Sequence, residues 1–285
     1  EEAAKRKKTD NDNAVKGFNA AKDIDNAVDF ILTPHSIPLL PRHAKVLLLD
    51  IEGCTTAISF VKDVLFPYVL ANLDTYVDGL PEDEVTSVLT SLKADIEKIT
   101  IEDVKKECLD VKQDVSKDAV KSIVKILVKN DIKATGLKSL QGKMWKSGYA
   151  SGELKGHVYS DFKILLEWCQ KNSVQVNIYS SGSIAAQKLL FSNSADGDLT
   201  PLLHDYFDTT SGMKKESQSY KTIASKLGVA IQDIVFVSDA EGELVAAREA
   251  GMKHVVMSIR EGNAKLTDVG REFPSVFSLM QLCGV

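Results

Sequence analysis

The sequence predicts an α/β fold in which a doubly wound parallel sheet is interrupted by an inserted group of helices. The run Val46–Leu49 is apolar and is followed by Asp50, which is typical of a buried strand that ends at a ligand-binding edge. Residues 67–151 show helical spacing without strand signals, and strand-like and helical runs alternate from residue 161 onward. Strands separated by helices of this length form a parallel sheet with helices on both faces.

Residues 1–43 differ from the rest of the chain and are predicted to form an N-terminal extension or linker. They begin with the basic run Lys5–Lys8 and end in a proline-rich stretch, which favours an extended connector. Residues 20–32 between them are compatible with one amphipathic helix. The basic run is interpreted as a solvated tail, and a nuclear-import signal is the alternative.

Residues 44–67 are predicted to open the core, and residues 68–151 are predicted to form a helical cap. The acidic residues that follow Pro81 suit the first turn of a helix, where the helix dipole favours negative charge. Apolar residues then recur at helical spacing. One such stripe consists of Val85, Val88, Leu89 and Leu92, and a second consists of Ile123, Ile126 and Leu127.

Residues 152–285 are predicted to complete the core. The expected helices cover residues 161–170, 183–191, 217–227 and 241–250, and the expected strands cover residues 174–179, 234–237 and 254–259. Gly228 and Gly251 follow the last two helices, as glycines that end helices often do.

Length and charge limit the possible functions. A chain of 285 residues can form one core together with an inserted domain. The net charge of -5 argues against broad binding of nucleic acid, which depends on a basic surface. No apolar run approaches the roughly 20 residues of a membrane-spanning helix. We therefore expect neither nucleic acid nor a membrane as a partner.

The cysteines indicate a compartment. Cys54, Cys108, Cys169 and Cys283 lie far apart and show no paired spacing, which favours a reducing environment over a disulfide framework or a zinc site. The prediction is a cytoplasmic protein, with nuclear entry through the basic run as the alternative. The chain begins at Glu1 rather than Met, so a fragment or a removed targeting segment stays open.

Two carboxylates follow the first predicted strand. Asp50 is placed to attack as a nucleophile, and Glu52 is placed to move protons, which together indicate phosphoryl transfer through an aspartate. The alternatives are that Asp50 caps a helix or binds a structural ion, and that Glu52 is a solvated loop acid.

Other polar residues lie at the same predicted edge. Ser180 and Ser181 lie between a strand and a helix, where hydroxyls and N–H groups can hold phosphate oxygens, although such a run is also a common helix N-cap. Asp239 ends another strand, so that it and Asp50 offer the oxygen ligands that Mg²⁺ prefers.

These motifs resemble a known family. Asp50-Ile-Glu52-Gly is similar to the first motif of the haloacid dehalogenase-like phosphatases, usually Asp-x-Asp-Gly-Thr. The Glu variant resembles one branch, the enolase-phosphatases of methionine salvage. Further similar segments are Ser59–Tyr68, Leu140–Trp145, Ile178–Phe191 and Phe207–Thr209, and together the motifs extend from residue 45 to about residue 265.

The resemblance implies an activity. It implies a haloacid dehalogenase-type core with a helical cap and one Mg²⁺ per chain. The substrate would be 2,3-diketo-5-methylthiopentyl-1-phosphate, which is enolised and then dephosphorylated, through an aspartyl-phosphate, to the acireductone 1,2-dihydroxy-3-keto-5-methylthiopentene. By the same resemblance the protein is a monomer whose partner is this small phosphorylated diketone.

The resemblance also assigns residues. Asp50 and Glu52 would be catalytic, and Asp50, Asp239 and the main-chain carbonyl of Glu52 would bind the metal. Ser180, Ser181 and Lys214 would bind the substrate. Lys214 is preferred over Lys215 by its register between Gly212 and Glu216-Ser217. Glu243 is interpreted either as a support for Lys214 or a metal-bound water, or as a first-turn helix acid.

Some positions depart from the family pattern. Cys54 replaces a usual Thr, Ala57 a usual Pro, and Met213 a frequent His; the usual Lys-Ile after Asp208-Thr209 is missing. We expect these changes to affect substrate detail more than phosphatase chemistry. The loss of the hydroxyl at Cys54 would weaken activity rather than abolish it.

Alternative functions stay open. One is a phosphatase of the same superfamily that acts on another small phosphorylated metabolite, and the other is a non-catalytic interaction protein on the same fold.

Phe60, Phe66 and Trp145 are candidates to line an apolar pocket for the methylthio tail, although aromatic residues are more often ordinary core. The enolisation base is not assigned, with Glu52 as a candidate.

Overall fold

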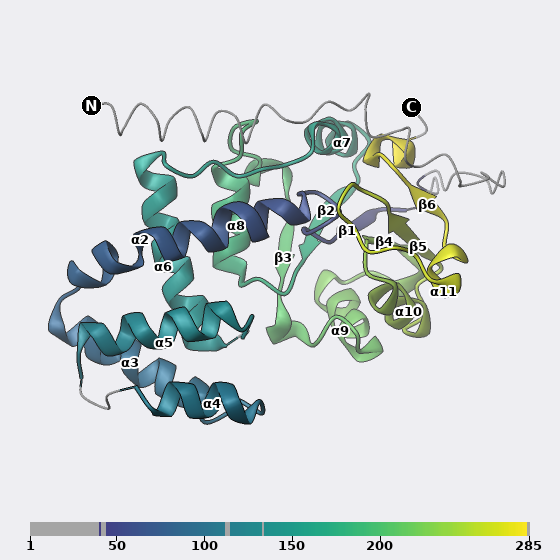
Figure 1. Ribbon diagram of the computed structural model, residues 1–285. Helices are drawn as coiled ribbons and strands as arrows, with labels where there is room; N and C mark the ends of the chain where they lie inside the picture. The colour runs from purple at the N-terminus through teal and green to yellow at the C-terminus, as the bar shows by residue number, and fades with distance from the viewer. Residues whose placement is uncertain (1–39, 41–43, 112–114, 133, 284–285) are drawn as a thin grey trace. The chain divides into compact units, whose positions relative to one another are not determined.

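The computed structural model describes residue 40 and residues 44–111, 115–132 and 134–283. The chain divides into two units, residues 1–36 and residues 37–285. The predicted basic run, the possible helix over residues 20–32 and the proline-rich connector lie outside the described residues. The account below concerns the second unit (Figure 1).

A six-stranded sheet carries the fold, and every pairing in it is parallel. The strand order is β3-β2-β1-β4-β5-β6, with β1 at the centre. The strands are β1 (Val46–Leu49), β2 (Gln175–Tyr179), β3 (Asp205–Phe207), β4 (Ile234–Ser238), β5 (His254–Ser258) and β6 (Ser275–Val276). β1 and β4 are buried along their whole length, as apolar strands covered on both faces are.

Helices follow or separate the strands as the sequence predicts. Between β1 and β2 lie the π-helix η1 (Phe60–Leu65) and α2 (Phe66–Asp78), α3 (Glu82–Ile96), α4 (Glu102–Leu109), α5 (Lys117–Lys129), α6 (Thr135–Ser151) and α7 (Ser160–Lys171). The later helices are α8 (Ile184–Ser192), α9 (Ser217–Leu227), α10 (Glu241–Glu249) and α11 (Asp268–Arg271). Short 3-10 turns are η2 (Thr200–Leu202), η3 (Thr209–Ser211), η4 (Ile231–Asp233) and η5 (Leu279–Cys283).

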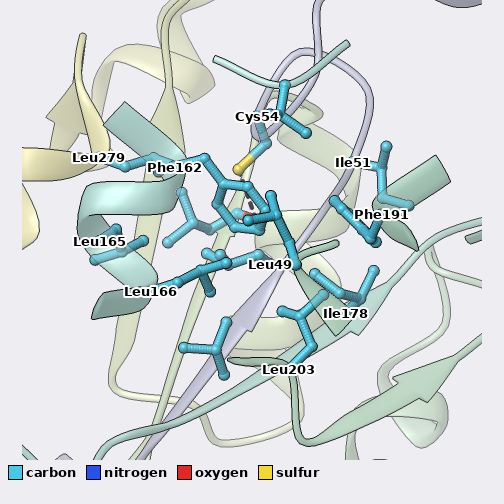
Figure 2. Packing of buried hydrophobic residues seen from close by; sticks show 14 of the residues in the cluster. Leu49, Ile51, Cys54, Phe162, Leu165, Leu166, Ile178, Phe191, Leu203 and Leu279 are labelled. Atoms are coloured by element: carbon cyan, nitrogen blue, oxygen red, sulfur yellow. Dashed lines mark hydrogen bonds between the residues drawn. The ribbon is translucent and has the colours of Figure 1, made fainter. Parts of the chain in front are cut away.

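The alternation of side chains along β1 divides the core into two layers. Leu47 and Leu49 pack with residues of α7 and α8, whereas Val46 and Leu48 pack with residues of α9 and α10. This is the two-residue period of a strand covered on both faces. Figure 2 shows the first layer, in which Leu49 lies among side chains of α7, β2 and α8.

The helices α2 to α6 have a hydrophobic cluster of their own, formed by residues between Val69 and Met144. Asp95 lies in the last turn of α3 and accepts hydrogen bonds from the backbone N–H groups of Gly136 (2.6 Å) and Leu137 (3.2 Å), at the start of α6. It thereby satisfies N–H groups that have no partner within the helix. The separate cluster supports the interpretation of this segment as a cap, and its boundaries at residues 68 and 151 stay a prediction.

The observed elements confirm the predicted fold class and most predicted helices and strands. The helix over Ser217–Leu227 has the predicted ends, and Gly228 after it has a φ of 67°, the left-handed conformation that glycine adopts readily. The expected start of helical structure at Pro67 is wrong, because η1 already begins at Phe60. The strands β3 and β6 were not predicted. Among the described ranges, the longest apolar helical stretches fall short of what a membrane crossing requires.

Candidate active site

The candidate site is formed where neighbouring parallel strands end. Asp50 directly follows β1, Ser180 follows β2 and Asp239 follows β4. The N–H of Asp50 donates to the carbonyl of Val237 (3.0 Å), so the ladder between β1 and β4 continues into the site. The topology thus gathers residues that lie far apart in the sequence at one edge of the sheet.

Lys214 joins two carboxylates at this edge. Its Nζ lies 2.6 Å from Asp50 Oδ1 and 2.7 Å from Glu243 Oε2, and all three side chains are largely buried. Burial alone would lower the pKa of Lys214, but Asp50 and Glu243 outweigh it and raise that pKa. Glu243 is therefore more than a first-turn helix acid, because it is an ion-pair partner of Lys214. Lys215 is exposed.

Tyrosines hold the loop that carries Lys214. The hydroxyl of Tyr220 donates to the carbonyl of Lys214 (2.6 Å), and the hydroxyl of Tyr179 donates to the carbonyl of Gly212 (2.8 Å). Lys214 Nζ also lies 5.8 Å from the centre of the Tyr179 ring. Met213 in the same loop is 56% exposed, so its side chain is not part of this buried contact.

Ser238 links the carboxylates and was not found by sequence reasoning. Its Oγ lies 2.7 Å from Glu243 Oε2 and 3.1 Å from Asp50 Oδ2, and it accepts a hydrogen bond from the N–H of Ala240 (3.1 Å). A hydroxyl carries one proton, so it donates to one carboxylate at a time. Burial, and then Asp50, raise the pKa of Glu243 to about 7.

The site has an excess of negative charge. Burial, and then the charges of Asp50 and Glu243, raise the pKa of Asp239 to about 7. Three carboxylates therefore face the single ammonium of Lys214 in this group. A divalent cation would offset the excess, and carboxylate oxygens are the ligands that Mg²⁺ prefers. The residues present fit such an ion.

Side chains alone do not complete a metal site. Within residues 40–283 as far as they are described, no group of three or more His, Cys, Asp or Glu side chains has the arrangement of a metal centre. The predicted set contains only two side-chain carboxylates, Asp50 and Asp239, with a main-chain carbonyl as the third ligand. Mg²⁺ is commonly bound by one or two protein carboxylates and keeps several water ligands, so a set of this size suits it.

The loop between β2 and α8 contains the serines that were predicted to bind phosphate. Ser183 is the N-cap of α8, and its Oγ accepts from the N–H of Ala186 (3.3 Å). The N-cap role thus belongs to Ser183, and Ser180 Oγ instead accepts from the N–H of Gly182 (3.2 Å). Ser181 is exposed and lines a cavity.

Asp208 fixes this loop and was not singled out as a site residue. One of its oxygens accepts from the N–H of Ile184 (3.2 Å), and the other accepts from the N–H (2.9 Å) and hydroxyl (2.6 Å) of Thr210. Burial would raise its pKa, but these hydrogen bonds lower it overall. Asp208 therefore connects the serine loop with the turn that leads to Lys214.

A cavity of about 540 Å³ adjoins these residues. Its polar side includes Glu52, Ser181 and Lys138 of α6, whose Nζ lies 3.4 Å from the carbonyl of Ser181. Its apolar side chains are Ile58, Val61, Phe66, Leu127, Val128, Ile132, Leu137, Trp145 and Ala186. Phe60 was expected here and is absent from the lining; it is buried in the core instead.

Two departures from the family pattern have local explanations. Cys54 is fully buried in the apolar layer shown in Figure 2, with its Sγ 3.7 Å from the carbonyl of Val237, and burial raises the pKa of its thiol. It faces the core rather than the cavity. The N–H of Ala57 donates to His157 Nδ1 (3.2 Å), a hydrogen bond that a proline at this position would lack.

Comparisons with known proteins bear on the fold and on the family of the chain. No family model matches the sequence. Two solved structures share the fold. A haloacid dehalogenase-type phosphatase from Thermococcus onnurineus has a TM-score of 0.50 and 19% identity, and the match covers 84% of this chain and 95% of that chain. A β-phosphoglucomutase from Thermotoga maritima has a TM-score of 0.51 and 12% identity, and the match covers 84% of this chain and 97% of that chain. At these identities the two structures show the fold alone, which is the haloacid dehalogenase-type α/β fold.

Closer relatives define the family. Enolase-phosphatase E1 of Drosophila melanogaster is 44% identical over 228 residues, which cover 80% of this chain and 88% of the relative. The Caenorhabditis elegans enzyme of that name is 40% identical, and the match covers 78% of this chain and 89% of the relative. The solved structure of the UTR4 protein of Saccharomyces cerevisiae has a TM-score of 0.66 and 32% identity, and the match covers 83% of this chain and 98% of that chain. The chain belongs to the enolase-phosphatase E1 family, and it is a phosphatase.

Proposed function

We propose that the protein is a Mg²⁺-dependent enolase-phosphatase that converts 2,3-diketo-5-methylthiopentyl-1-phosphate to 1,2-dihydroxy-3-keto-5-methylthiopentene and phosphate. One observation carries the proposal. The cavity joins an apolar wall, which suits a methylthio tail, to Glu52 and Ser181 in the loops after β1 and β2. Asp50, which pairs with Lys214, begins the first of these loops.

Phosphoryl transfer is assigned to Asp50 and Glu52. A carboxylate oxygen of Asp50 attacks phosphorus, the bond between phosphorus and the substrate oxygen breaks, and Glu52 gives its proton to that oxygen. In the second half, Glu52 takes a proton from water as the water attacks the aspartyl-phosphate, which releases phosphate and restores Asp50. The half-buried position of Glu52 in the cavity wall supports this role.

The phosphoryl charge is balanced by Lys214 and a metal ion. Catalysis of this transfer is mainly positioning and electrostatic stabilisation. Asp50, Asp239 and the main-chain carbonyl of Glu52 would hold Mg²⁺, and the ion would supply positive charge to the phosphoryl oxygens. Ser180 and Ser181 would hold those oxygens from the other side. The negative excess at Asp239 and Glu243 supports a bound cation.

Enolisation precedes phosphate release. The product carries an enediol across carbons 1 and 2, so a base must remove a proton from the carbon that bears the phosphate ester. Glu52 is a candidate for this base. Lys138 would stabilise the oxyanion that forms, since its ammonium lines the cavity next to Ser181 and can interact with developing negative charge.

The experiment is a comparison of kcat/KM for the methylthio substrate and for a small polar phosphate monoester, each with Mg²⁺ and with a chelator. We expect turnover of the methylthio substrate that needs Mg²⁺ and is lost in Asp50→Asn. Equal or greater turnover of the polar monoester, still dependent on Asp50, would instead indicate a phosphatase for another small metabolite. Activity that survives Asp50→Asn would contradict the proposal.

A further inference from the structure

Asn263 lies in the loop after β5 and has no role in the mechanism above. Its Nδ2 donates to the carbonyl of Gly53 (3.0 Å) and to the carbonyl of Ser258 (3.1 Å). The hydroxyl of Ser258 donates to the same Gly53 carbonyl (2.9 Å). Two side chains from the far end of the chain therefore fix the turn that follows Asp50 and Glu52.

These contacts also determine how the amide of Asn263 is oriented. Carbonyl oxygens only accept hydrogen bonds, so the group between the carbonyls of Gly53 and Ser258 must be the NH₂. The other end, Oδ1, is buried and has no hydrogen-bond partner among the residues that the structure describes. A buried acceptor without a partner destabilises the fold, and such atoms are uncommon unless a ligand or water satisfies them.

Asn263 Oδ1 and a carboxylate oxygen of Asp239, the predicted metal ligand, both lie next to Gly53. A Cβ atom on Gly53 would lie 2.6 Å from Asn263 Oδ1 and 2.5 Å from Asp239 Oδ2. Both oxygens thus converge on one face of Gly53, close enough for one water molecule to contact both. With a φ of 70°, Gly53 gives them the space that another residue would fill.

We propose that Asn263 is a positioning residue of the Mg²⁺ site. Through Nδ2 it fixes the Glu52–Gly53 turn, whose carbonyl at Glu52 is the proposed third ligand. Through Oδ1 it accepts a hydrogen bond from water held beside Asp239. This inference rests on the proposed function, because it requires the ion that the function uses.

The test is a calorimetric titration of the full chain with Mg²⁺ in the absence of substrate. We expect Asn263→Ala to weaken Mg²⁺ binding about 10–100-fold, the usual effect of removing a group that orients metal ligands. Ser258→Ala removes the other donor to the Gly53 carbonyl but leaves Asn263 Oδ1, and we expect a smaller loss. Excess Mg²⁺ should restore phosphatase activity to Asn263→Ala, which a general structural defect would prevent.

The outcomes separate this inference from the proposed function. Wild-type protein that binds no Mg²⁺ would contradict the metal-dependent function and, with it, the role of Asn263. Wild-type protein that binds Mg²⁺ no better than a folded Asn263→Ala variant would overturn the inference alone. If Asn263→Ala does not fold, Asn263→Ser takes its place: it keeps one small donor but lacks the acceptor near Asp239, and unchanged Mg²⁺ affinity would again overturn the inference.

Discussion

Lys214 is the residue on which the charge balance of the site depends. Asp50 and Glu243 contact its ammonium directly, and Asp239 adds a third carboxylate to the same surroundings. Removing one partner from a buried ion pair leaves the other charge uncompensated, which is far more costly than losing a surface ion pair. The stability of the metal-free protein should therefore depend on Lys214 and on pH.

We expect Lys214→Met to lower the free energy of unfolding by about 3 kcal/mol at pH 8. The pKa values of Asp239 and Glu243 are raised to about 7, so both carboxyls take up protons in the folded state as the pH falls through 7. At pH 5 these two carboxyls are neutral in the folded state and no longer need the ammonium of Lys214. The free energy of unfolding that Lys214→Met removes should therefore be smaller at pH 5 than at pH 8. Urea unfolding of metal-free protein at both pH values measures it. Lys215→Met, at an exposed position, is the control, and an equal loss at the two pH values would contradict the account.

His157 gives a pH effect of the opposite sign. Burial lowers its pKa, with Asp196 opposing the shift, and its Nδ1 accepts from the N–H of Ala57. The unfolded chain therefore binds more protons at this residue once the pH drops below the ordinary histidine value of about 6.5, and stability is lost as the pH falls. We expect His157→Gln, which retains an acceptor, to lose less stability between pH 7 and pH 5 than the wild type. An unchanged or steeper loss would show that His157 does not contribute.

Sequence reasoning could identify some of these residues but not others. Asp50 and Asp239 each end an apolar run, so their meeting follows from the parallel topology. The roles of Ser238, Asp208 and Asn263 depend on loops that meet only in the fold, and each residue type is common in loops for other reasons. For Glu243, position on a helix allowed two interpretations, and only its distance to Lys214 separates them.

At the scale of elements, the first turns of α6 carry two of the cavity residues, Leu137 and Lys138, and Asp95 caps the start of this helix. Besides Gly136 and Leu137, the N–H of Thr135 donates to this buried carboxylate (3.2 Å). Negative charge at a helix N-terminus is favoured by the helix dipole, and here it also satisfies N–H groups without partners in the helix.

We expect Asp95→Ala to destabilise the protein by about 2 kcal/mol, the upper range for loss of a helix cap. The control is Asp83→Ala, which removes an exposed first-turn acid of α3 and should cost well under 1 kcal/mol. Chemical unfolding of both variants measures the difference. Equal effects would show that Asp95 acts only as a general negative charge.

Short or irregular elements were the part of the fold that the pattern could not predict. β3 has three residues and β6 has two, too few for a period to be recognised, and both lie beyond the central strands. The π-helix η1 extends helical structure back to Phe60, ahead of the Pro67 that suggested a boundary. Proline at the first turn of α2 is compatible with a helix, so it marks that turn rather than the start of the helical region.

At the scale of the whole described unit, the cavity combines residues of the sheet edge with residues of α5 and α6. Val128 lies in its apolar wall, and Val128→Thr exchanges a methyl group for a hydroxyl at nearly constant volume. We expect this variant to raise KM for the methylthio substrate by roughly 10-fold, because the wall would no longer suit an apolar tail. KM for the same diketone phosphate without its methylthio group should change little, and equal changes for the two would contradict the assignment of this wall.

The central claim is that one site both enolises and dephosphorylates the substrate. The most direct measurement records phosphate release and the ultraviolet absorbance of the enediol together, with Mg²⁺, in the wild type and in Asp50→Asn. The account predicts that the two products appear in equal amounts in the wild type and that phosphate release is lost in the variant. Phosphate without the enediol, or phosphate release that does not need Asp50, would contradict it.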